Sequence, residues 1–213
     1  MSGILDLLNG ETGKAIISGV SNQTNQPEDK TQSVLTMALP VLMTAMKRNA
    51  ATPEGAQGLM SALNSNKHDG GILNNLSGLF GGGVDANVLN DGSKILGHVL
   101  GGKQSTVEQT LSAKSGMDLG SVSQILKVAA PILMGMLAKQ TKEKNVDSAG
   151  GLEGMLGSLL GGNSAKQEQS FLEAILDADN DGSVIDDVAG MVLGGNKNKG
   201  GLGGMLGGLF GGK

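Results

Sequence analysis

A proline-centred apolar segment occurs twice in this chain and constrains its fold more than any other feature. Residues 34–46 read VLTMALPVLMTAM and residues 125–137 read ILKVAAPILMGML, so that Pro131 takes the place of Pro40. Large apolar residues recur at intervals of three and four in both copies, which is the periodicity of one helical face. Each copy therefore predicts a helix with a wide apolar side, and each proline is expected to kink or break it.

A second repeat is a 14-residue segment flanked by glycine, and it occurs three times. The copies are GGILNNLSGLFGGG at 70–83, GGLEGMLGSLLGGN at 150–163 and GGLGGMLGGLFGGK at 200–213. Large apolar residues keep the spacing i, i+4, i+7 and i+8, which places them on one helical face. Glycine costs an isolated helix about 1 kcal/mol per residue, so we expect these segments to be helical only where they dock.

A third repeat divides the chain into two related units. Asn90-Asp91-Gly92-Ser93 precedes a Gly-His-Val-Leu-Gly-Gly run, and Asn180-Asp181-Gly182-Ser183 precedes a Gly-Met-Val-Leu-Gly-Gly run. We interpret both Asn-Asp-Gly-Ser motifs as turns. The resulting organisation is an N-terminal helix at 1–26, helical unit 1 at 27–102, a connecting helix at 103–117, helical unit 2 at 118–195 and a Gly-rich tail at 196–213.

The local signals at the predicted helix ends also favour an all-α fold. Thr52-Pro53-Glu54 is typical of a helix start, and Ser105 with Glu108 has the spacing of a capping box. No segment shows the alternation of a strand. The chain has three Phe, no Tyr and no Trp, so its core must come from Leu, Ile, Val, Met and Ala. We predict an all-α protein of two related multi-helix units with Pro-kinked helices and a Gly-rich C-terminal tail.

Charge and composition exclude several classes of function. A net charge of −4 without a basic face argues against nucleic-acid binding. The absence of Cys fits a reducing compartment. The N-terminus lacks the pattern of a signal peptide, and no stretch of 18 apolar residues is present, so we expect no membrane span and a cytoplasmic location.

The segment around 94–116 resembles a known bacterial family. The run Lys94-Ile-Leu-Gly-His-Val-Leu-Gly-Gly-Lys-Gln104, followed by Val107-Glu108 and Ser115-Gly116, is similar to the bacterial domain of unknown function 937, also called YidB-like. The proline-centred helix at 125–137 and the Asp-rich segment at 177–187 add to this resemblance, which covers most of residues 30–195. It implies a small helical bacterial protein and supplies no activity or catalytic residues.

The Asp-rich segment is the strongest candidate site. Asp177, Asp179 and Asp181 occupy positions 1, 3 and 5 of an EF-hand-like loop, Gly182 occupies position 6, and the Ser183 carbonyl would serve as position 7. Position 12 is Val188, where an EF-hand has a bidentate Glu, so Asp187 at position 11, or Asp186 at position 10, would have to close the site. The sequence therefore predicts a weak Ca²⁺ site, with a Kd of about 10⁻⁴–10⁻³ M.

Each candidate motif also has a simpler structural interpretation. The Asp-rich segment can be a plain turn in which Asp186 caps the next helix. Gly97 to Lys103 spells part of a phosphate-binding loop, but Gln104 replaces the required Ser or Thr, so a helix that ends in glycine explains it better. His98 is expected to be a packed or C-terminal-capping residue.

No nucleophile, base and orienting group can be picked out, so we expect the protein not to be an enzyme. Our first hypothesis is a non-enzymatic structural or interaction protein that binds protein partners and self-associates through its Gly-flanked apolar helices. The alternative is a calcium-binding module in which Ca²⁺ bound at 177–187 orders the second helical unit.

Overall fold

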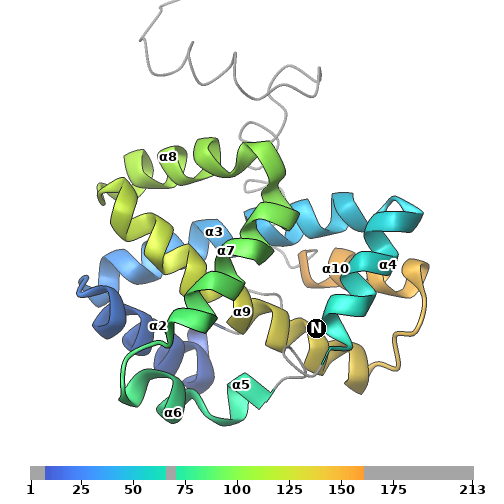
Figure 1. Cartoon of the computed structure of the whole chain (residues 1–213), viewed down its shortest axis with the longest axis horizontal. Coiled ribbons are helices and arrows are strands. Elements are labelled where there is room, and N and C mark those ends of the chain that lie inside the picture. Colours follow the sequence, from blue (N-terminus) through green and yellow to red (C-terminus); the bar gives the residue numbers. More distant parts are fainter. Residues whose placement is uncertain (1–7, 66–70, 161–213) are drawn as a thin grey trace, which may run out of the picture.

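The computed structural model describes residues 8–65 and 71–160, and within these ranges the chain is helical apart from short connections (Figure 1). This confirms the all-α prediction. The part of predicted unit 2 after residue 160 and the Gly-rich tail at 196–213 lie outside the described residues. The helices are α2 (Glu11–Thr24), α3 (Glu28–Ala50), α4 (Pro53–Leu63), α5 (Gly71–Asn74), α6 (Leu76–Gly81), α7 (Ala86–Leu100), the 3-10 helix η1 (Gly101–Lys103), α8 (Gln104–Ser115), α9 (Leu119–Glu143) and α10 (Ala149–Leu160).

The two proline-centred segments form α3 and α9, the two longest of these helices. Both helices continue through their prolines, Pro40 and Pro131. The sequence predicted a kink or a break at each proline, and neither proline breaks its helix. An interior proline costs a helix about 3 kcal/mol, and this cost is offset by burial, because both prolines lie in the interior with apolar neighbours on each side.

Local chemistry explains where the long helices begin and end. The helix α3 has Glu28 and Asp29 in its first turn and Lys47 and Arg48 in its last, which complements the helix dipole at both ends. At the start of α9, the Asp118 carboxylate accepts hydrogen bonds from the Ser121 backbone N–H at 2.9 Å and from its hydroxyl at 2.6 Å. The hydrogen bonds from Ser121 lower the pKa of Asp118.

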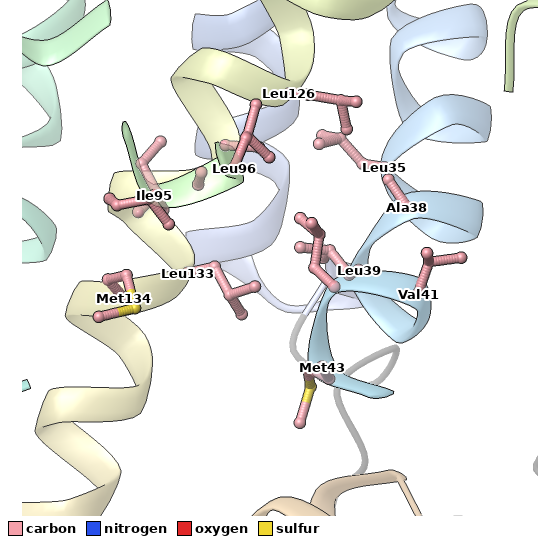
Figure 2. Packing of buried hydrophobic residues seen from close by; sticks show 14 of the residues in the cluster. Leu35, Ala38, Leu39, Val41, Met43, Ile95, Leu96, Leu126, Leu133 and Met134 are labelled. Carbon is pink, nitrogen blue, oxygen red and sulfur yellow. The ribbon is translucent and has the colours of Figure 1, made fainter. Parts of the chain in front are cut away.

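A single apolar core joins helices from both predicted units. The helix α9 runs through the centre of the molecule (Figure 1) and makes its most extensive contact with α7, from the other predicted unit. Conversely, α10 packs on α3 and α4. Figure 2 shows the meeting of α3, α7 and α9, where Leu35, Leu96 and Leu126 are almost completely buried. Each central helix is thus covered by an element from the other half of the sequence.

The Asn90-Asp91-Gly92-Ser93 motif is not a turn, as the sequence predicted, but part of the interior of α7. Its glycine explains the difference, because Gly92 is buried where α7 crosses α9. A β-carbon at Gly92 would overlap the backbone carbonyl of Lys127. The motif therefore permits a close approach of two helices, a role that turn propensity does not reveal.

The first two Gly-flanked segments are helical and docked. The copy at 150–163 gives α10, with Leu152, Leu156 and Leu159 buried on the predicted face. The copy at 70–83 is divided into α5 and α6, because the Asn75 side chain accepts a hydrogen bond from the Gly78 N–H at 3.1 Å and so starts a new helix. Its apolar residues pack against the core.

One described helix, α9, is long and apolar enough to pass a test for membrane-spanning segments. An 18-residue stretch of this helix has a mean hydropathy of 1.5, and 72% of that stretch is buried inside the structure. Burial of this extent is typical of the central helix of a packed helical core, whose apolar sides are covered by neighbouring helices.

Candidate functional site

An apolar groove with a volume of about 420 Å³ lies between α4 and α7. The wall from α4 consists of Gly55, Gly58, Leu59 and Ala62, and the α7 wall consists of Ile95, His98 and Val99. Met46 of α3 and Met134 of α9 also line the groove, together with Asn49 and Glu54. Figure 2 shows Ile95 and Met134 close together on one side of the core cluster.

The helical periodicity of α4 creates this wall. Gly55, Gly58, Leu59 and Ala62 follow the spacing i, i+3, i+4 and i+7, so they share one face of the helix. The two glycines have different functions. A β-carbon at Gly55 would overlap the Asn49 carbonyl of α3, whereas one at Gly58 would meet nothing within 4 Å. Gly55 therefore permits close helix packing, and Gly58 leaves the groove open.

Thr52 and Asn49 hold the two walls in place. The Thr52 side chain caps α4 by accepting a hydrogen bond from the Gly55 N–H at 3.2 Å, as the Thr-Pro-Glu motif predicted. The Asn49 side-chain amide donates to the carbonyls of His98 and Val99, at 3.3 and 3.2 Å. These carbonyls belong to the last turn of α7, where no intrahelical donor remains. The end of α7 is thereby tied to α3.

The lining of the groove suits a mainly apolar ligand. Its volume lies in the range of about 300–1,000 Å³ that is usual for binding pockets. Met46 and Met134 are both buried, and the flexible thioether side chain can adapt its shape to a ligand. The exposed side chains of Glu54 and His98 supply polar groups. A helix that presents leucine or phenylalanine side chains has the matching chemistry.

Glu108 is a buried carboxylate outside the groove. The predicted capping box of Ser105 and Glu108 is wrong, because α8 begins at Gln104 and follows directly on η1. Glu108 is only 8% exposed, and its carboxylate accepts hydrogen bonds from Gln104 Nε2 at 2.8 Å and Ser123 Oγ at 3.3 Å. It links α8 to α9, which is a structural role.

The predicted calcium ligands lie outside the described residues: Asp177, Asp179, Asp181, Ser183 and Asp187. Among the residues that the structure does describe, no three acidic or histidine side chains gather closely enough to hold a metal ion.

The structure confirms the predicted helix that ends in glycine at 97–103. The segment that precedes Gly101 is a helix, α7, and Gly101 follows it with φ of 57°, so the phosphate-loop interpretation is excluded there. His98 lies in the last turn of α7 but is exposed beside the groove. Of the two alternatives predicted for His98, a packed residue or a C-terminal-capping residue, the structure excludes the packed one and places the side chain in the last turn of the helix.

The sequence did not predict a groove between α4 and α7. The rows of residues that form its walls on α4 and α7 are short, and the row on α4 contains two glycines. Neither row therefore resembles a conventional apolar helix face. A usable signal was present nevertheless. Gly58 lies in the middle of a well-capped helix, where glycine is unfavourable by about 1 kcal/mol, and such a position commonly serves packing or binding.

The comparisons with known proteins give one match. A family model described as "Bacterial protein of unknown function (DUF937)" matches residues 6–140. No curated protein and no solved structure matches the chain. The matched residues include α2 to α8, most of α9 and every residue that lines the groove.

Proposed function

The chain belongs to this DUF937 family of bacterial proteins, and we propose that it is a non-enzymatic interaction protein whose groove binds an apolar helical segment of a protein partner. The open apolar groove between α4 and α7 carries this proposal. We further propose that a second copy of the chain is such a partner, because each copy contains Gly-flanked segments with the required apolar face.

The shape of the groove supports a helix as its occupant. Gly58 removes side-chain bulk from one wall, and small residues allow another backbone to approach closely. The residues Leu59 and Val99 are half-buried on opposite walls. An apolar helix seated between these walls would remove their remaining surface from water, which is favourable by about 25 cal/mol per Å².

Replacing Gly58 with leucine is expected to weaken self-association about tenfold, because a side chain that fills the groove removes about 1.4 kcal/mol of binding free energy or more. The fold should be retained, since Gly58 faces open space and leucine favours helices. Sedimentation velocity over a range of protein concentrations measures the effect. The matched control is Gly154→Leu, at an exposed, open position of α10 outside the groove.

Two results would count against the proposal. A wild-type chain that stays monomeric at every concentration would remove self-association. Equal association of the Gly58→Leu and Gly154→Leu variants would show that association does not use the groove.

A calcium-binding module is the second candidate function, and the acidic residues of 177–187 support it. The Asn-Asp-Gly-Ser motif alone does not support calcium binding, because the first copy of this motif lies inside the helix α7. The proposal depends on Asp177, Asp179 and Asp187, which are additional to that motif. The five carboxylates of residues 177–187 are close in sequence and repel one another unless a cation neutralises them.

Calcium is expected to raise the free energy of unfolding by about 1–2 kcal/mol at about 5 mM Ca²⁺, for a Kd within the weak range. Denaturant unfolding of the full chain with and without Ca²⁺ measures this effect. The double variant Asp177→Asn with Asp179→Asn should lose it, whereas Asp147→Asn, at an exposed position outside the segment, should keep it. If Ca²⁺ leaves wild-type stability unchanged, the calcium hypothesis is wrong.

A further inference from the structure

Two copies of the Gly-flanked segment show how this segment binds apolar surfaces. In α10, three leucines at the spacing i, i+4 and i+7 are buried against the rest of the chain: Leu152, Leu156 and Leu159. In α5 and α6, the four corresponding residues are partly buried against the same core: Ile72, Leu76, Leu79 and Phe80. Both copies therefore dock within their own chain, and both do so through the apolar residues of the repeated pattern.

The third copy, at 200–213, has the same face and lies outside the described residues. Leu202, Leu206, Leu209 and Phe210 occupy the repeated positions. The docking sites of the first two copies are already filled by α5, α6 and α10. The groove between α4 and α7 is an apolar site of suitable chemistry that no described element fills.

The course of the chain favours its own third copy as the occupant. The last described helix, α10, packs against α4, which is one wall of the groove. Residues 161–199 connect α10 to the third copy, and a chain of this length extends much further than the width of a helix pair. A segment tethered in this way competes at an effective concentration set by the length of its tether, without dilution into the solvent.

Charge also favours this occupant. The groove includes the acidic side chain of Glu54. After Asp187 the sequence contains no acidic residue, and its charged side chains are Lys197, Lys199 and Lys213. A segment flanked only by lysines can approach the carboxylate without repulsion.

We propose that residues 200–213 occupy the groove of their own chain and compete there with the segment of a second copy. The inference rests on the proposed function and adds that the tail of the same chain regulates binding in the groove. Because glycine-rich segments form helices poorly on their own, the tail is expected to leave the groove readily. Self-association then becomes an exchange of tails between copies, and each groove is open only while its own tail is away.

A labelled synthetic peptide of residues 200–213 tests this inference against the full-length chain. The double variant Leu206→Asp with Leu209→Asp disables the tail while leaving the groove unchanged. Peptide should bind this variant at least about tenfold more tightly than it binds wild type, because the tethered competitor is lost. Fluorescence anisotropy measures both affinities. Adding Gly58→Leu to the variant should abolish binding, whereas adding Gly154→Leu should not.

The possible results separate the inference from the function on which it rests. Equal peptide binding by wild type and the tail variant, blocked by Gly58→Leu, would overturn the inference and leave the groove as a binding site. Absence of binding to either protein, with a monomeric wild type, would overturn both.

An engineered cysteine pair distinguishes a chain's own tail from that of a second copy. The natural chain has no cysteine, so any disulfide must join the introduced residues. Gly58→Cys with Leu206→Cys should form a disulfide within one chain in dilute protein, about tenfold faster than Gly154→Cys with Leu206→Cys. Disulfides that only join two chains, or equal rates for the two pairs, would contradict occupation by the chain's own tail.

Discussion

Alanine in place of Gly92 is expected to lower the free energy of unfolding by about 2–3 kcal/mol, the upper part of the range for overpacked interiors. Its β-carbon would overlap the backbone carbonyl oxygen of Lys127, where α7 crosses α9. A carbonyl in the middle of a helix cannot move aside as the end of a flexible side chain can. The two helices that make the most extensive mutual contact in the structure would therefore have to separate.

Gly97 provides a matched control in the same helix. It is exposed, and a β-carbon there would meet nothing within 4 Å. Gly97→Ala should therefore raise the free energy of unfolding, by up to about 1 kcal/mol, through helix propensity alone. Urea unfolding followed by circular dichroism measures both variants. If both Gly92→Ala and Gly97→Ala raise the free energy of unfolding, α7 does not depend on a close crossing at Gly92.

The second large effect is expected at two corresponding leucines, Leu35 of α3 and Leu126 of α9. Both are at most 1% exposed and both belong to the shared core (Figure 2). Leu35→Ala and Leu126→Ala should each lower the free energy of unfolding by about 2–5 kcal/mol, because each leaves a cavity in a close-packed interior. Since the core is continuous, each substitution should shift one common unfolding transition.

Denaturant unfolding observed by two independent probes tests whether that transition is single. Leu119→Ala is the control, because Leu119 is 45% exposed at the start of α9 and should change stability by no more than about 0.5 kcal/mol. Two separate transitions, each sensitive to only one of the core substitutions, would mean that the two repeat units fold independently of each other.

Most of the helices were predictable from the sequence because their signals are local. Apolar residues at intervals of three and four marked α3 and α9, and the Thr-Pro-Glu motif marked the first residue of α4. Position 101 ends α7 as the glycine there predicted. These features depend on residues a few positions apart, where the rules of helix formation are strongest.

The predictions that failed depended on contacts between distant residues. The Asn-Asp-Gly-Ser motif has the composition of a turn, but its glycine at 92 serves contact with α9, more than thirty positions away. Likewise, Glu108 has the spacing of a capping box and instead bonds to Ser123 of α9. Tertiary packing overrides such local preferences, and one sequence does not reveal which distant segment will supply the contact.

The groove could not be predicted for the same reason. Its lining comes from four helices, and Met46 and Met134 enter it from the two copies of the proline-centred repeat. Helical periodicity does place Gly55, Gly58 and Leu59 on one face of α4. It does not show that α7 stands opposite at a distance that leaves the space between them open.

The crossed packing of the two halves has a consequence for biosynthesis. When α3 leaves the ribosome, α9 and α10, which cover its apolar face in the finished fold, have not yet been translated. The nascent chain must therefore carry the exposed face of α3 through the synthesis of α4 to α8. At typical translation rates of about 5–20 residues per second this interval lasts several seconds, during which a chaperone that binds apolar segments would protect the chain from aggregation.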